Sequence, residues 1–301
     1  MSSFTRSLAG DYAGIAYVIG AAFFWSLTSL FVKFVGQEGM SSQQIVLIRA
    51  VVTLIYSYIL IWWSDEASLW GTNVRLLWLQ GFFGFATLSC FFFALTKLPL
   101  ADATVIHYTN PVFTALIAAA VLGEKLRASE LLGALASLGG VALIVQPSFA
   151  LGEPSAALNL TYVGVALLGA ICASSAQVLI RKLRETEHPL VVVFYLPLVA
   201  ILGGLPTAAG TELQWPTCWE WVMLVGGVAG CAQVAQILLT NGLHNEKAGR
   251  AMAVSYLQIV FAAGWGLLVF GEKTDSLSVA GALLVAVGAS LAASKSGEEK
   301  R

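Results

Sequence analysis

Two stretches of this sequence decide its fold, because both carry the same pattern. Residues 101–125 read ADATVIHYTNPVFTALIAAAVLGEK, and residues 249–273 read GRAMAVSYLQIVFAAGWGLLVFGEK. They align without a gap at a spacing of 148 residues, so that Tyr108 corresponds to Tyr256, and both end in Gly-Glu-Lys. Between its charged ends each stretch is apolar over about 20 residues, the length that crosses the hydrocarbon core of a bilayer. The pattern predicts one membrane-spanning helix that occurs twice.

The repetition extends beyond these two stretches. At the same spacing two further pairs of glycines correspond, and at a spacing of 149 residues the first span of each half also matches. Five spans per half is an odd number, so the second half must enter the membrane from the opposite side. Inverted repeats of this kind are typical of alternating-access carriers. The additional pairs are Phe113 with Phe261, Gly133 with Gly281, Gly140 with Gly288, Gly20 with Gly169 and Lys33 with Lys182.

The composition excludes a soluble protein. Of the 301 residues, 58% are hydrophobic and 11% are charged, and the mean hydropathy is +0.81. A soluble domain carries roughly 45–50% apolar and about 25% charged residues. The net charge of −1 provides no basic surface for a nucleic acid. We therefore expect lipid to be the main solvent and nucleic acid not to be a partner.

Ten apolar stretches are long enough to span a membrane. We expect no removable signal peptide before the first of them, because residues 1–11 hold a single Arg and no small-residue cleavage site follows the first apolar run. We predict an all-α integral membrane protein with ten transmembrane helices arranged as two inverted five-helix repeats, residues 1–150 and 151–301. The predicted spans are 13–35, 44–63, 73–96, 101–122, 128–146, 160–182, 189–209, 219–243, 248–270 and 276–294.

The distribution of Lys and Arg predicts the orientation. With the N-terminus inside, the inner segments carry twelve of these residues and the outer segments carry three, while Arg49 lies within the second span. Cytoplasmic loops carry such an excess of positive charge. We expect both termini to be cytoplasmic, and a plasma (inner) membrane is the default location.

The chain resembles a known family through several motifs. Leu98-Pro-Leu-Ala-Asp-Ala-Thr-Val-Ile106, Asn110-Pro-Val-Phe-Thr114 and Gly123-Glu-Lys125 are similar to the fourth-span signature of the EamA family of the drug/metabolite transporter superfamily. Ser29-Leu-Phe-Val-Lys33, Arg49 and Asn245-Glu-Lys-Ala-Gly249 are also similar, and the chain resembles the G branch of solute carrier family 35. The resemblance implies a fold of ten spans in two inverted repeats. It also implies a pathway lined by spans one, three, four, six, eight and nine. The chain lacks the Gly-Ala-Leu-Asn-Lys type of motif associated with nucleotide-sugar carriers, which disfavours that cargo.

Polar side chains within the spans are the candidates for a binding site, because polar groups in hydrocarbon are costly and face the bundle interior. The alternative is that they only hydrogen-bond neighbouring helices. By helical spacing, the candidates for substrate binding or gating are Trp25, Ser29, Gln177, Gln233, Gln236, Tyr108, Tyr256 and Gln258.

Four ionisable residues complete the candidate set. His107 lies in the middle of the fourth span, where it could bind an anion or relay a proton, or be a structural residue. Arg49 lies about five residues into its span, roughly 8 Å deep. It could reach the outer surface, pair with Asp102 or hold an anionic cargo group. The residue that corresponds to Asp102 at the spacing of 148 is Arg250, which could pair with Glu246 or Glu185, or be an ordinary interfacial charge.

The sequence favours a carrier over an enzyme or a channel. It has no metal-ligand motif and no pair of acidic residues within spans, so we expect no catalysis, no metal and no cofactor. We predict a secondary transporter of small organic solutes, with an organic acid or an amino-acid-like cargo favoured by Arg49 and His107. The alternatives are an exporter of nucleobase- or drug-like amphipathic solutes and, from another class, a structural or channel-like membrane protein. The expected partners are a small organic solute and the lipid bilayer, with a homodimer left open.

Overall fold

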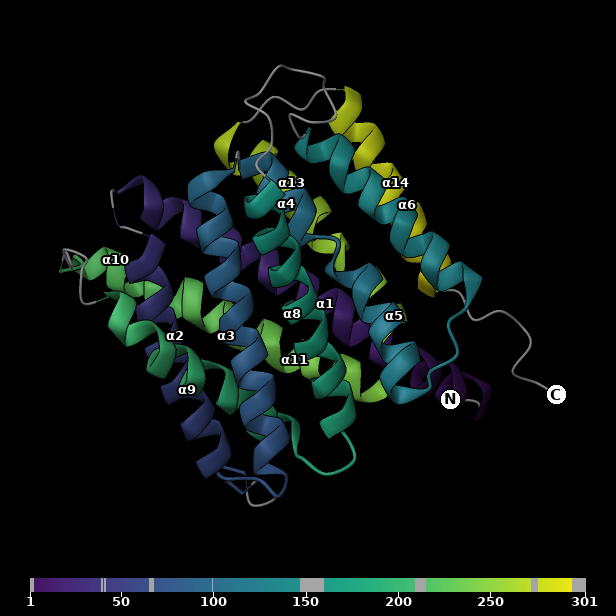
Figure 1. The fold of residues 1–301 in the computed structure, drawn as a ribbon, viewed down its shortest axis with the longest axis horizontal. Helices are drawn as coiled ribbons and strands as arrows, with labels where there is room; N and C mark the ends of the chain where they lie inside the picture. The colour runs from purple at the N-terminus through teal and green to yellow at the C-terminus, as the bar shows by residue number, and fades with distance from the viewer. Residues whose placement is uncertain are drawn as a thin grey trace.

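The computed structural model is a bundle of helices that pack side by side (Figure 1). It describes residues 3–38, 40, 42–64, 68–98, 100–146, 160–208, 215–271 and 276–293. The second Gly-Glu-Lys motif of the predicted pattern lies partly outside these residues, at positions 272–273. The helices are α1 (Ser3–Gln37), α2 (Ser42–Trp62), α3 (Val74–Lys97), α4 (Leu100–His107), α5 (Asn110–Leu122), α6 (Ala128–Val145), α8 (Leu160–Leu183), α9 (Pro189–Ala208), α10 (Cys218–Val222), the π-helix η1 (Met223–Gly230), α11 (Cys231–Asn245), α12 (Ala248–Ser255), α13 (Leu257–Phe270) and α14 (Ser276–Ala293).

These helices confirm the predicted fold class. Within the described residues, nine helical segments are long and apolar enough to cross a membrane, and a tenth, Pro189–Gly204, is apolar but shorter. Two of the crossings consist of two helices each, α4 with α5 and α12 with α13. Large apolar side chains such as Trp62, Leu160 and Leu268 are exposed on the outside of the bundle, where lipid would cover them.

The two halves repeat one another in their secondary structure. At the spacing of 148 residues the bounds of α4 and α6 coincide with those of α12 and α14, and α5 matches α13 except that α13 begins one residue earlier. Both α5 and α13 end at a glycine in the left-handed conformation, Gly123 with φ 65° and Gly271 with φ 63°, which only glycine adopts without strain. We call two elements or residues that match in this way counterparts.

Helices α6 and α14 are counterparts, and they pack directly against each other. A Cβ atom added to Gly133 would lie 2.5 Å from the carbonyl oxygen of Gly288, and one added to Gly140 would lie 2.6 Å from that of Gly281. The pairing of 133 with 288 and of 140 with 281 shows that the helices run antiparallel. Midway, the Ser137 hydroxyl donates to the carbonyl of its own counterpart, Val285, at 3.4 Å. Counterparts can meet in this way only where a two-fold axis relates them, so the repeat is inverted in space.

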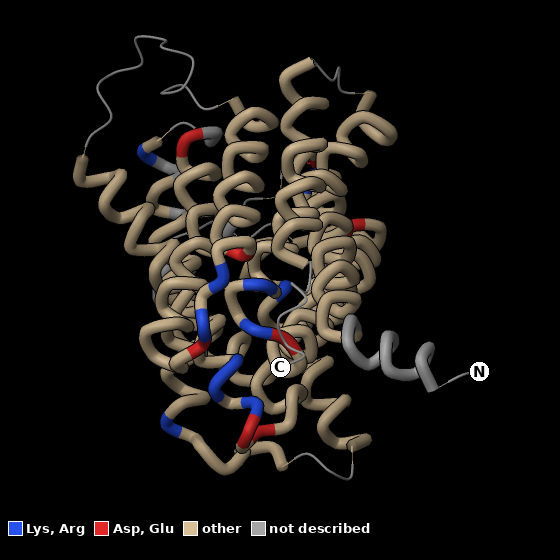
Figure 2. The backbone as a smooth tube through the Cα atoms, turned by 90° about the vertical axis from the view of Figure 1, so that its right-hand side faces the viewer, with Lys and Arg blue, Asp and Glu red and all other residues tan. Residues whose placement is uncertain are grey.

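One face of the bundle gathers most of its positive charge, as the view in Figure 2 shows. The ends of α5, α8 and α11 and the start of α12 lie together here, since one cluster of hydrogen bonds joins all four. We call this end of the bundle the basic face and the other end the opposite face. The described Lys and Arg residues at these helix ends and the adjoining loops are Lys125, Arg127, Arg181, Lys182, Arg184, Lys247 and Arg250.

Candidate functional site

Two helices of the bundle are interrupted at corresponding places. The first interruption lies at Tyr108 and Thr109, between α4 and α5, and the second lies at Tyr256, between α12 and α13. Pro111 stands in the first turn of α5, where its missing N–H leaves no hydrogen bond unmade. The Asn110 amide donates to the backbone carbonyl of His107 at 2.9 Å and satisfies one group that the interruption frees.

The two interruptions touch each other at the centre of the bundle. The Tyr256 hydroxyl donates to the backbone carbonyl of Tyr108 at 2.6 Å, and the two rings lie 6.2 Å apart. Since these residues are counterparts, this contact lies on the same two-fold axis as the contact between Ser137 and Val285. The irregular backbone of both halves therefore meets at one point, as carriers with inverted repeats often show at their binding site.

A cavity of about 280 Å³ lies beside this point. Its lining combines one guanidinium, one imidazole, several amides and hydroxyls, and no carboxylate of the described residues. Such a lining suits a solute that carries hydrogen-bonding groups and negative charge. The polar lining residues are Arg49, Gln80, Thr87, His107, Tyr108, Asn110, Gln177, Gln236, Ser255 and Gln258, and Trp25 adds an aromatic wall.

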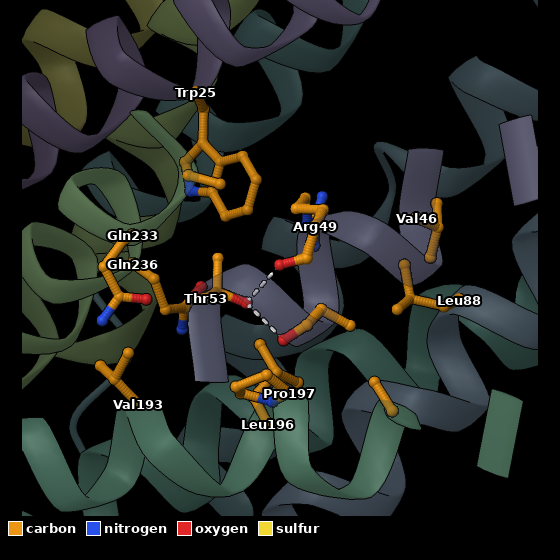
Figure 3. A pocket seen from close by; sticks show the side chains of 13 residues that line it. Trp25, Val46, Arg49, Thr53, Leu88, Val193, Leu196, Pro197, Gln233 and Gln236 are labelled. Atoms are coloured by element: carbon orange, nitrogen blue, oxygen red, sulfur yellow. Dashed lines mark hydrogen bonds between the residues drawn. The ribbon is translucent and has the colours of Figure 1, made fainter. Parts of the chain in front are cut away.

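Arg49 lines both this cavity and an adjoining pocket of about 30 Å³, and Figure 3 shows it in the smaller pocket. Its guanidinium carbon lies 5.4 Å from the ring centroid of Trp25, within reach of a cation–π attraction. Thr53 does not engage the guanidinium, because its hydroxyl donates to the Arg49 backbone carbonyl at 2.8 Å. No carboxylate among the described residues forms an ion pair with Arg49, so the pair with Asp102, one of the three possibilities given for Arg49, does not form in this structure. The guanidinium of Arg49 thus lines the cavity with the Trp25 ring beside it.

Three buried polar atoms of the lining residues have no hydrogen-bond partner within the described parts of the chain. They are Oε1 of Gln80, Oε1 of Gln177 and Nδ1 of His107. The His107 ring packs against the Phe91 ring, with centroids 4.6 Å apart. An unsatisfied buried polar atom is costly, and bound water or a ligand is the usual explanation. Three such atoms around one cavity indicate that the cavity accommodates water or a polar ligand.

The structure brings eight of the twelve predicted site residues to the two pockets and places four elsewhere. Trp25, Arg49, His107, Tyr108, Gln177, Gln236 and Gln258 line the cavity, and Gln233 lines the adjoining pocket, where its amide donates to the Ser57 hydroxyl at 2.9 Å.

The remaining four have other surroundings. Tyr256 is fully buried behind its bond to Tyr108, and Asp102 is fully buried outside the cavity lining. Ser29 lines a separate pocket between α1 and α13, and its hydroxyl donates to the Trp25 carbonyl at 3.2 Å. Arg250 forms the predicted ion pair with Glu246, at 2.9 Å, and also donates to the carbonyls of Ala292 and Ala293 at the end of α14.

Arg181 forms a clasp at the basic face that the sequence does not suggest. Its guanidinium donates to Glu124 at 2.8 Å and to the backbone carbonyls of Leu243 and His244 at 3.0 and 2.9 Å. The other oxygen of Glu124 accepts the backbone N–H of Ala248 at 3.0 Å. The clasp, which we define as Arg181 and Glu124 with these three partners, joins helix ends from both repeats. Arg181 is almost fully buried, so the clasp is shielded from solvent.

The two faces of the bundle are packed differently. At the basic face α12 packs against α5, α6 and α8. The counterpart of α12 is α4, and the counterparts of α5, α6 and α8 are α13, α14 and α1. Among the described residues, α4 does not pack against these three helices to a comparable extent. Likewise, α8 packs against α11, whereas their counterparts α1 and α3 do not pack against each other to a comparable extent among the described residues. The cavity is therefore sealed more tightly toward the basic face than toward the opposite face.

The sequence patterns missed several lining residues for an identifiable reason. Gln80 and Ser255 lie on polar faces of their helices. The sequence does not show whether a residue on such a face lines a cavity or only hydrogen-bonds a neighbouring helix. Asn110 corresponds to Gln258 at the interruption, and that correspondence is the signal that could have placed it in the site.

A polar cavity whose described lining includes one guanidinium, set between two inverted repeats of helices long enough to span a membrane, is the architecture of a multi-pass membrane transporter. Comparison with known proteins agrees. The model of the EamA-like transporter family matches the chain twice, at residues 12–146 and 160–294. The chain belongs to this family, which confirms the resemblance given by its motifs.

Individual relatives are also transport proteins by name. The chain is 30% identical to the pseudopaline exporter CntI of Pseudomonas aeruginosa, over 91% of this chain and 94% of that protein. It is 29% identical to solute carrier family 35 member G1 of Mus musculus, over 91% of this chain and 76% of that protein. One solved crystal structure matches with a TM-score of 0.79 at 20% identity, covering 93% of this chain and 96% of the other, which supports the fold.

Proposed function

We propose that this protein is a secondary carrier of small organic solutes and that it binds an organic acid or an amino-acid-like cargo in the central cavity. The observation that carries the proposal is Arg49, which faces the cavity without a partner carboxylate among the described residues. A guanidinium binds a carboxylate through two parallel hydrogen bonds, which fixes the orientation of the ligand. The amides of Gln177, Gln236 and Gln258 supply further hydrogen bonds to the rest of the solute.

The carrier works by alternating access, with both termini in the cytoplasm. The excess of Lys and Arg assigns the basic face to the cytoplasm. Since the cavity is sealed more tightly toward that face, we interpret this structure as the outward-open conformation of the proposed cycle. In the inward-open conformation each repeat takes the arrangement that its counterpart has here, as inverted repeats permit. The relative named as an exporter supports export as the direction. A plasma membrane is our default location.

One alternative is favoured by a specific observation. Trp25 and Tyr108 both line the cavity and offer aromatic faces to a flat amphipathic solute. A nucleobase- or drug-like cargo would use these faces and would not need Arg49. Neither version requires catalysis, a metal or a cofactor.

The first experiment screens solutes by thermal stabilisation of the purified protein, because a ligand that binds only the folded state raises the melting temperature. We expect stabilisation by some carboxylates, lost in Arg49→Gln and partly kept in Arg49→Lys. Stabilisation only by neutral aromatics, equal in the native protein and both variants, would favour the alternative. The Thr53→Val variant is a matched control, because the Thr53 hydroxyl is bound to backbone and should not contribute to anion binding.

A further inference from the structure

Helices α3 and α8 form one wall of the central cavity and pack closely against each other. They run antiparallel, because the segment just before α3 is hydrogen-bonded to the segment just after α8. Toward the other end of this wall, a Cβ atom added to Gly169 would lie 2.9 Å from the Cβ of Cys90. Between two and three turns from that contact, in the direction of the basic face, Gln80 on α3 and Gln177 on α8 stand at about the same level. Both line the cavity, and we call them the glutamine pair.

Each member of the glutamine pair has a buried amide oxygen that lacks a hydrogen-bond donor. Oε1 of Gln80 and Oε1 of Gln177 have no partner within the described parts of the chain, and Gln80 is only 1% exposed. By contrast, the hydroxyl of Ser174, one turn from Gln177, donates to the Asn110 carbonyl at 2.8 Å. A buried acceptor without a donor is costly, so two of them at one level of the same wall indicate a ligand that brings donors of its own.

Arg49 lies on a different wall of the cavity. It comes from α2, which packs chiefly against α9 and η1, and within the described residues α2 makes no comparable contact with α3 or α8. The cavity thus presents a cation on one wall and two hydrogen-bond acceptors on another. An ammonium group has three N–H donors and no acceptor, so it can satisfy both amide oxygens at once, whereas a hydroxyl has a single donor.

We propose that the glutamine pair is the subsite for an amino group of the cargo, so that the protein selects carboxylates that carry an amino group over plain organic acids. This inference rests on the proposed function, because the carboxylate of the same solute is assigned to Arg49. It decides between the two cargo classes that the proposed function leaves open. Gln177 lies one helical turn before Arg181, so the amino group is bound at the end of the cavity nearest the clasp and the basic face.

Matched solutes test this selection on the native protein. Each pair shares the carboxylate and the side chain and differs only in the α-amino group: phenylalanine with 3-phenylpropionate, leucine with 4-methylpentanoate, and glutamate with glutarate. Dissociation constants come from thermal-shift titration of the purified protein. A hydrogen bond to a charged group changes affinity at least about tenfold, so we expect the amino acid of at least one pair to bind about a hundredfold more tightly than its partner. The 2-hydroxy analogue, with one donor, should gain only about tenfold.

The same substitution at three glutamines separates recognition from structure. Gln80→Met and Gln177→Met each remove one amide oxygen at nearly constant side-chain length, and each should lower the preference for the amino acid about tenfold. Neither should lower the melting temperature of the ligand-free protein, because the oxygen that is removed has no partner. In the matched control, Gln233→Met, the amide that is lost donates to the Ser57 hydroxyl at 2.9 Å. This control should lower the melting temperature and leave the preference unchanged.

Two results on the native protein would overturn the inference. Equal affinity within every pair, or a hydroxy analogue that binds as tightly as the amino acid, would show that the glutamine pair does not select an amino group. Stabilisation by the carboxylates in the same titrations would leave the proposed anion site intact.

Solutes that carry the amino group alone separate the two proposals from the other side. The probes 2-phenylethylamine and 3-methylbutylamine are titrated against Arg49→Gln, in which no guanidinium repels their ammonium. Amine binding that is lost when Gln80→Met is added, together with no carboxylate binding by the native protein, would sustain the inference and contradict the anion site. An absence of binding by every solute with an amino group would overturn the inference whatever the carboxylates do.

Discussion

Two neighbouring glycines on α6 should respond in opposite directions to the same substitution. Gly140 faces α14, where an added Cβ atom would lie 2.6 Å from the carbonyl oxygen of Gly281 and 2.8 Å from the backbone nitrogen of Val285. At Gly139 an added Cβ atom would meet only a methyl carbon of Leu284, also on α14, at 3.7 Å, which is an ordinary side-chain contact. Gly140→Ala therefore forces two helix backbones apart, and Gly139→Ala does not.

The expected changes in the free energy of unfolding follow from two contributions, overpacking at the contact and the helix propensity of Ala over Gly. Overpacking at a close contact costs about 1–3 kcal/mol, and Ala is favoured over Gly in a helix by about 0.5–1 kcal/mol. Gly140→Ala should lower the free energy of unfolding by about 1–2 kcal/mol, and Gly139→Ala should leave it unchanged or raise it by up to about 1 kcal/mol.

Unfolding of the purified variants in detergent, followed by tryptophan fluorescence, measures both values. Neither glycine lines the cavity, so solute binding by the folded variants should be preserved. Equal stability of the two variants would refute the direct contact between the backbones of α6 and α14 and, with it, this part of the two-fold axis.

Three further substitutions test other parts of the structure. Arg49→Gln should weaken binding of a stabilising carboxylate at least about tenfold and Arg49→Lys less, because only a guanidinium binds both carboxylate oxygens in parallel; titration by thermal shift measures this. Tyr256→Phe removes the 2.6 Å hydrogen bond between the repeats and should lower the free energy of unfolding by about 1 kcal/mol, whereas a change below the error of denaturant unfolding would contradict the bond. Glu187→Gln weakens the carboxylate bonds to the Thr72 backbone N–H and hydroxyl, at 2.8 and 2.7 Å, and should cost about 1–2 kcal/mol, while the exposed Glu185→Gln should cost nothing in the same assay.

The overall fold could be predicted from the sequence because its signals are local or periodic. Span length follows from apolar runs, and the inverted arrangement follows from an odd number of spans in each repeat. The glycines at 133, 140, 281 and 288 correspond in sequence, and the structure uses all four at one helix crossing.

The interruption of the ninth span could not be predicted in the same way. Pro111 signals the interruption between α4 and α5, but its counterpart is Ile259, which carries no such signal. The bond from Tyr256 to the carbonyl of Tyr108 depends on contact between the repeats, and no pattern within one helix reveals it. The π-helix η1 is similar, since the close approach of Gly227 to the Phe31 ring becomes visible only when the helices are packed.

The candidate site was predictable in its residue types and not in its boundaries. Helical spacing assigns a side chain to a stripe, but it does not say which part of the stripe faces the cavity. Ser29 and Trp25 lie one turn apart on α1, yet only Trp25 lines the central cavity. Arg181 and Glu124 are 57 residues apart, so their ion pair depends on tertiary structure alone.

Counterflow in proteoliposomes tests the central claim, a carrier with an anion site at Arg49, most directly. Vesicles loaded with an unlabelled carboxylate that stabilises the protein are diluted into a trace of the labelled solute. We predict saturable accumulation of the label against its gradient by the native protein, and a loss of most of it in Arg49→Gln at the same solute concentration. Uptake that does not saturate and is not stimulated by internal solute would contradict the carrier, and undiminished counterflow in Arg49→Gln would contradict the anion site.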